Sequence, residues 1–164
     1  MVMFLALVSL EFYAERVECR AYGDTLEVNA LYYMRSDPTT KFCLLYPLPE
    51  EGADFQLVSC ENCEVKQRGE VWVMCLDFGP DSLVATRVVY RQRFPEGVFR
   101  YITTTTRAWG KPLEKAEFLV EAPWPATVSY RPDTSAEKDG RFTYEMTILG
   151  FWPDEDLVFR KAKD

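Results

Sequence analysis

Residues 17–34 read VECRAYGDTLEVNALYYM, and this stretch decides the fold class. From Leu26 to Met34 apolar residues occupy every second position, which is the period of a strand with one buried face. Gly23-Asp24 is a two-residue turn signal of the kind that joins two antiparallel strands. A hairpin closed at this turn places six apolar side chains on one face, as a correct register requires. The predicted pairs are Ala21 with Leu26, Cys19 with Val28, and Val17 with Ala30.

The next part of the chain shows the same alternation in three short runs. Residues 55–60, 63–67 and 71–78 are predicted strands, separated by the turns Glu61-Asn62 and Arg68-Gly69. These turns predict a three-stranded meander. Its predicted pairs are Val58 with Val65, Val65 with Trp72, and Cys63 with Met74.

Further strands are predicted to the end of the chain. The Thr103–Thr106 run favours extended backbone, because β-branched side chains restrict the helix. Residues 113–122 fit a strand by alternation, although Pro112 and several good helix formers leave a helix open. About eleven short strands with little or no helix predict an all-β chain, an antiparallel β-sandwich forming a single domain over residues 1–164. The remaining predicted strands are 83–94, 98–108, 127–130, 141–149 and 157–160, with connections at 132–140 and 150–156.

Composition excludes several function classes. Of the 164 residues 48% are hydrophobic and 27% charged, which excludes a disordered chain. The net charge of −7 argues against binding to nucleic acid or anionic lipid, which basic patches drive. The absence of histidine removes the commonest general base and metal ligand. Asparagine and glutamine are scarce beside many charged residues, a pattern associated with thermophiles.

The first residues form the most apolar run of the chain. Val2–Leu10 is far shorter than the roughly 20 residues of a membrane helix. It also lacks a basic start and a small-residue cleavage site, the marks of a signal peptide. The run is therefore predicted to be a buried first strand, and no membrane insertion is expected.

Five cysteines occur at positions 19, 43, 60, 63 and 75. Only Cys60 and Cys63 have the spacing of a known motif, and three functional interpretations compete for them. They could form a redox pair, a local disulfide, or half of a zinc site, but the chain holds no second Cys-x-x-Cys for the other half. The structural alternative is that these cysteines, like Cys19, are small apolar residues filling sheet positions.

Tryptophans and acidic clusters are the other candidate sites. Trp109, Trp124 and Trp152 stand near prolines in predicted loops, where they could cap the core, contact a protein or stack on a sugar ring. Glu50-Glu51 and Asp154–Asp156 could serve glycoside hydrolysis or calcium binding. No motif accompanies either cluster, so both are predicted to lie in solvated loops.

One block of the chain resembles a known group of proteins. Arg100–Phe118, with its threonine run, tryptophan turn and P-L-x-x-A-x-F strand, is similar to uncharacterised prokaryotic cell-envelope β-sandwich domains. Ala6–Leu10 adds to this resemblance, which covers about twenty residues in the block. It implies a β-sandwich outside the cytoplasm and favours strand for residues 113–122. It implies no activity and no functional residues.

These observations predict a non-enzymatic β-sandwich that acts as an interaction or structural module. The alternatives are a carbohydrate-binding module using Trp109, Trp124 or Trp152, and a redox or metal-binding protein using Cys60 and Cys63. The leading interpretation needs no cofactor or metal. Its partner would be a protein or a glycan, and the sequence leaves the oligomeric state open.

Overall fold

A computed structural model describes residues 10–80 and 82–163 of the chain. It is all-β, with thirteen strands and one six-residue 3-10 helix, labelled η1, among the described residues. No helix in those two ranges has the length and apolar character of a membrane span. The elements are β1 Glu11–Tyr22, β2 Thr25–Arg35, β3 Lys41–Tyr46, β4 Ala53–Glu61, β5 Glu64–Arg68, β6 Val71–Asp77, β7 Leu83–Arg93, β8 Val98–Tyr101, η1 Thr104–Trp109, β9 Leu113–Ala122, β10 Ala126–Val128, β11 Thr134–Lys138, β12 Arg141–Phe151 and β13 Leu157–Lys161.

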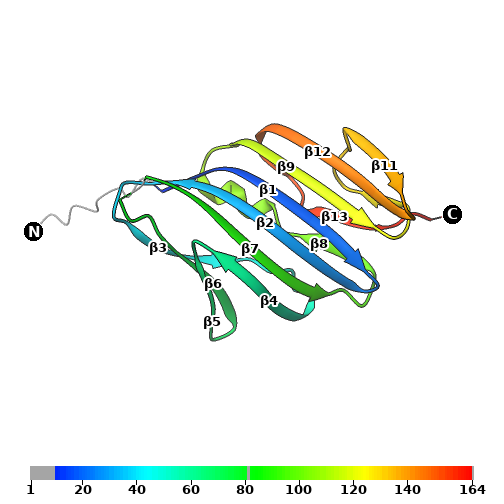
Figure 1. The fold of residues 1–164 in the computed structure, drawn as a ribbon, viewed down its shortest axis with the longest axis horizontal. Coiled ribbons are helices and arrows are strands. Elements are labelled where there is room, and N and C mark those ends of the chain that lie inside the picture. The colour runs from blue at the N-terminus through cyan, green and yellow to red at the C-terminus, as the bar shows by residue number, and fades with distance from the viewer. Residues whose placement is uncertain (1–9, 81, 164) are drawn as a thin grey trace, which may run out of the picture.

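The strands form one large sheet and two small ones (Figure 1). The large sheet has the order β11-β12-β9-β1-β2-β7-β4. The small sheets have the orders β10-β13-β8 and β3-β6-β5. Both pack against the same face of the large sheet, because its inward side chains contact aromatic residues of each. Tyr90 of β7 meets Tyr46 of β3, and Phe118 of β9 meets Tyr130, which follows β10.

The predicted hairpin is confirmed. β1 and β2 are antiparallel with the expected register, and Gly23 takes a left-handed φ of 60° in the turn. All six paired side chains, Cys19 included, are fully buried. The alternate residues of β2 from Leu26 to Met34 are buried as well, so this hairpin forms the centre of the core.

The predicted meander is wrong in its first pairing. β4 pairs with β7 in the large sheet, whereas β5 pairs with β6 in a small one. Asn62 has a left-handed φ of 57°, and the two-residue link carries the chain from one layer to the other. The β5–β6 turn lies at Gly69-Glu70. The second pairing is therefore shifted in register: Val65 faces Met74 and not Trp72, and the predicted pair of Cys63 with Met74 is wrong.

The topology also differs from a wholly antiparallel arrangement. β1 and β9 are neighbours in the large sheet and run parallel, although most of the chain lies between them in the sequence. The described residues contain thirteen strands and not eleven, because β3 and β11 were not predicted. β11 is five exposed residues, TSAEK, so it lacks the alternation that identified the other strands. The predicted first strand, Val2–Leu10, lies outside the described residues apart from Leu10.

The predicted strand at 98–108 ends early. Strand structure stops at Tyr101, and Thr104–Trp109 form η1. The threonine run adopts this helix because Asp156 accepts hydrogen bonds from its first backbone N–H groups, which outweighs the strand preference of threonine. Gly110 ends the helix at a left-handed φ of 78°. The next segment, left open between strand and helix, is strand β9 as predicted.

Candidate functional site

Among the residues that the structure describes, the buried core contains one carboxyl group, that of Glu15, whose residue is only 2% exposed. β1 has a bulge between Phe12 and Ala14, so Tyr13 is an extra residue in the pairing with β2. Phe12 and Glu15 both point into the core as a result, although they are three residues apart. Sequence reasoning missed Glu15. The available signal was its position two residues before Val17, which places it on the buried face of the hairpin.

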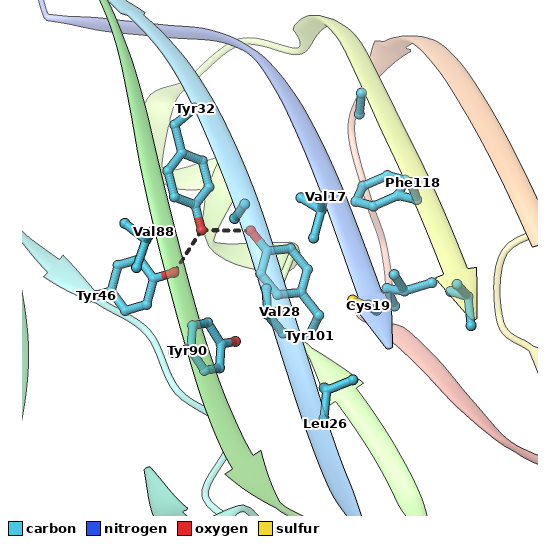
Figure 2. Packing of buried hydrophobic residues seen from close by; sticks show 14 of the residues in the cluster. Val17, Cys19, Leu26, Val28, Tyr32, Tyr46, Val88, Tyr90, Tyr101 and Phe118 are labelled. Atoms are coloured by element: carbon cyan, nitrogen blue, oxygen red, sulfur yellow. Dashed lines mark hydrogen bonds between the residues drawn. The ribbon is translucent and has the colours of Figure 1, made fainter. Parts of the chain in front are cut away.

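Three tyrosines connect to Glu15 in a chain of hydroxyl groups. Figure 2 shows the Tyr32 hydroxyl between those of Tyr46 and Tyr101. Tyr101 donates to Glu15 Oε2 at 3.4 Å, and its hydroxyl lies 2.9 Å from that of Tyr32. The Tyr32 hydroxyl lies 3.0 Å from that of Tyr46. The chain therefore runs from β1 through β8 and β2 to β3, and it links the large sheet to both small sheets.

Burial controls the charge of this network. Loss of solvent raises the pKa of Glu15 to about 8, and the long hydrogen bond from Tyr101 offsets only part of that effect. Burial also raises the pKa values of Tyr32, Tyr46 and Tyr101, so these hydroxyls stay neutral. Glu15 Oε1 has no hydrogen-bond partner among the described residues. A buried carboxyl in this state favours its protonated form at neutral pH.

The two cysteines with motif spacing are free thiols, so no disulfide joins them in the structure. The Cys60 thiol donates to the backbone carbonyl of Cys63 at 3.2 Å. Burial, with a smaller contribution from Cys60, raises the pKa of Cys63 to about 12. A redox pair needs the opposite shift, because the thiolate is the reactive form. The described residues contain no group of three His, Cys, Asp or Glu that could hold a metal ion.

The structure instead contains a disulfide bond between Cys43 and Cys75. These residues face each other on neighbouring strands β3 and β6, with 4.0 Å between their Cα atoms. Sequence reasoning missed this pair, because β3 itself was not predicted. Cys43 is exposed on the outer side of the small sheet.

An open groove of about 750 Å³ lies beside this disulfide, where β6 ends and β7 begins. Apolar side chains from both layers line it, among them Phe42, Leu76 and Val84, and Cys63 contributes to the wall. Two ion pairs neutralise charged groups of its lining. Lys41 lies 3.0 Å from Asp77, and Lys66 lies 2.9 Å from Glu64. The lining thus offers apolar contacts with little net charge.

The three loop tryptophans do not form one surface. Trp109 packs its ring edge-on against Phe12, and Trp124 stacks on Phe99, so both rings cover the core. Trp152 is 38% exposed, but the Arg107 guanidinium lies 5.1 Å from its ring centre. Trp109 and Trp152 flank the start of β9, whereas Trp124 follows its end, about 30 Å away along a ten-residue strand. Sugar stacking therefore stays a prediction that depends on Trp152 alone.

Asp156 is not the solvated loop residue that was predicted, because it fixes η1 in place. Its Oδ1 accepts bonds from the Thr103 and Thr104 amides at 2.9 and 3.0 Å, and from the Thr104 hydroxyl at 2.9 Å. Burial tends to raise the pKa of Asp156, but these bonds outweigh it and the pKa is lowered. Asp156 thereby positions the helix that carries Trp109.

Replacing Asp156 by alanine is expected to lower the free energy of unfolding by about 2–3 kcal/mol, because the Thr103 and Thr104 donors and the Arg100 guanidinium lose a charged acceptor. Urea unfolding followed by tryptophan fluorescence would measure the loss. Asp154→Ala is the matched control, since its side chain is 85% exposed and pairs only with Arg107. Equal midpoints for the two variants would contradict the positioning role of Asp156.

The outer face of the large sheet carries paired charges. Arg87, Arg91 and Arg93 lie on it, and each meets a carboxylate. Arg91 lies 2.8 Å from Glu27, and Arg93 lies 2.9 Å from Asp24. The arginines of β7 therefore form an ion-pair network across the sheet and not a free basic patch.

Comparison with known proteins finds solved structures with a similar fold. No protein family and no curated protein matches the chain. Among solved structures, a candidate nutrient-binding protein from Legionella pneumophila matches with a TM-score of 0.65 at 12% identity, over 92% of this chain and 67% of its own. An M1 zinc metallopeptidase from Deinococcus radiodurans gives 0.57 at 15% identity, over 92% and 42%. Yeast LTA4 hydrolase gives 0.55 at 7% identity, over 94% and 30%.

These likenesses concern the fold, and this chain is shorter than each of those proteins. It spans about two thirds of the nutrient-binding protein and less than half of the other two proteins. Its residues do not fit a peptidase zinc centre of the H-E-x-x-H type, because the chain has no histidine. The described residues also lack any three-ligand cluster.

Proposed function

We propose that this chain is a non-enzymatic β-sandwich that acts as an interaction module with a protein partner. The observation that carries the proposal is the recurrence of this fold as a fraction of longer chains, from 67% of one to 30% of another. A fold that recurs as one part of longer proteins is suited to contacting or holding the other parts of those proteins. The layered arrangement of one large and two small sheets supports the sandwich description.

The surface supports the same proposal. Most arginines of the large sheet are neutralised within the chain, whereas several large apolar side chains remain exposed. Leu45 and Leu149 are 72% and 75% exposed. These two leucines lie on β3 and β12, in different sheets, so each is a separate exposed apolar position and not part of one continuous patch. The Cys43–Cys75 disulfide fits the predicted location outside the cytoplasm, since disulfides persist in oxidising compartments.

Affinity capture tests the proposal. The full chain, immobilised without reducing agent, is expected to recover a protein saturably from an extract of its source organism, and an immobilised unrelated all-β protein serves as the control. In parallel, the purified chain is expected to turn over no substrate in a panel of peptides, esters and glycosides. Turnover that follows the chain through two purification steps, with no protein recovered, would contradict the interaction module.

A further inference from the structure

We propose that the free edge of β3 binds an extended segment of a partner protein by adding it as a further strand. This inference rests on the proposed interaction module and names its surface. β3 is an edge strand of the sheet β3-β6-β5. Its side chains include Leu45, the second most exposed large apolar residue among those described.

Hydrogen-bond alternation shows which backbone groups of β3 are free. The Phe78 amide donates to the Thr40 carbonyl at 2.9 Å, so Thr40 and Phe78 form a hydrogen-bonded pair. Bonding in an antiparallel ladder alternates, so Phe42 and Leu44 also bond to β6. Lys41, Cys43 and Leu45 then direct their N–H and C=O groups away from β6.

The disulfide supports this assignment independently. Non-hydrogen-bonded pairs bring their Cα atoms to about 4.5 Å, and hydrogen-bonded pairs keep them about 5.5 Å apart. The Cα atoms of Cys43 and Cys75 are 4.0 Å apart, so this pair is of the non-hydrogen-bonded kind. Within residues 10–80 and 82–163, no loop backbone group bonds to Lys41, Cys43 or Leu45. All three residues are exposed.

β3 also lacks the protection that three other edge strands, β4, β5 and β11, have. β5 carries charged residues at alternate positions, β11 ends in a glutamate and a lysine, and β4 is interrupted by two register shifts. The sequence of β3, KFCLLY, contains one charged residue, Lys41, and that residue is paired with Asp77. Proteins normally block an edge of this kind against unwanted pairing, so an open one indicates use as a binding edge.

The surroundings of β3 indicate the chemistry of the partner. Outward side chains of an added strand would contact Leu45 and the Cys43–Cys75 disulfide, which favours apolar residues at alternate positions. Asp37 and Glu50 are exposed, each four residues from one end of β3. Neither belongs to an ion pair among the described residues, which favours basic residues at both ends of the partner segment. A second copy would instead bring another net charge of −7 with the same acidic ends.

The probe is the peptide KKVTVTVKK, added to the full chain without reducing agent. Amide hydrogen exchange by NMR is expected to slow about tenfold or more at Cys43 and Leu45. The amides of Phe42 and Leu44 should change little, because they already bond to β6. The peptides KKVTPTVKK, which cannot continue a ladder, and EEVTVTVEE, which has the wrong charge, should have no comparable effect.

Leu45→Pro removes only the outward N–H and leaves the bonds to β6, so it should abolish peptide protection at Cys43 with a nearly unchanged unfolding midpoint. Leu45→Ala keeps the amide and should weaken binding only a few-fold, and Leu149→Ala should not alter it. Absence of protection in the wild type, or its persistence in Leu45→Pro, overturns the proposal. Protection that grows with protein concentration alone would assign the edge to a second copy. If a captured protein binds wild type and Leu45→Pro equally, the interaction module stands and the β3 edge is excluded.

Discussion

Replacing Glu15 by glutamine is expected to raise the free energy of unfolding at pH 7 by about 3 kcal/mol. The Glu15 carboxyl is buried and has a folded pKa of about 8, against an ordinary value of 4.5. At pH 7 the unfolded chain gains the free energy of ionising Glu15, and the folded chain largely does not. Glutamine has the same shape as the protonated acid and nothing to ionise, so it removes this advantage of the unfolded state.

The raised pKa of Glu15 also determines how the stability difference between wild type and Glu15→Gln changes with pH. A raised folded pKa means that the contribution of Glu15 to stability is complete below pH 4.5, decreases as the pH rises, and is lowest above pH 8. Urea unfolding at pH 4, 6, 7 and 8.5 should show wild type and Glu15→Gln converging at pH 4 and diverging upward. Glu18→Gln is the control, because Glu18 lies on the outer face and pairs with Arg20 at 3.1 Å. Parallel pH profiles for wild type and Glu15→Gln would exclude a buried neutral carboxyl.

Reduction of the Cys43–Cys75 disulfide is expected to lower the free energy of unfolding by about 3–4 kcal/mol, because the bond closes a loop of 32 residues in the unfolded chain. Urea unfolding with and without a reducing agent measures the difference. The double variant Cys43→Ser/Cys75→Ser should match the reduced wild type. Cys60→Ser, which removes a free thiol, should retain the full response to reduction. A wild type that does not respond to reduction would show that the disulfide does not constrain the chain.

The sequence predicts those elements whose side chains alternate. The hairpin at Gly23-Asp24 was correct to the residue pair, since six apolar residues specify one register. Leu113–Ala122 was correctly a strand for the same reason. Such patterns indicate which face of a strand is buried, but they do not indicate which other strand pairs with it in the sheet. The parallel neighbours β1 and β9, and the transfer of the chain at Asn62 between layers, could therefore not be predicted.

The candidate sites were harder to predict, because they depend on contacts between distant segments. η1 exists because Asp156 reaches the Thr103 amide, 53 residues earlier in the chain. Cys43 and Cys75 meet only once β3 is known to pair with β6. Glu15 continues the buried alternation of β1, but its carboxyl group is held in the core by a hydrogen bond from Tyr101, 86 residues later in the chain. In each case the decisive interaction joins residues that a local pattern does not relate.

The position of β1 affects how the chain can fold during its synthesis. β1 lies between β2 and β9, but its partner on the β9 side, Val120 opposite Cys19, follows it by about a hundred residues. At about 5–20 residues per second, ribosomes leave that side of β1 unpaired for roughly 5–20 seconds after the hairpin emerges. Closing so long a loop is also entropically slow compared with forming the hairpin. A nascent chain of this protein is therefore most vulnerable to chaperone capture or misassociation along β1, before β9 has left the exit tunnel.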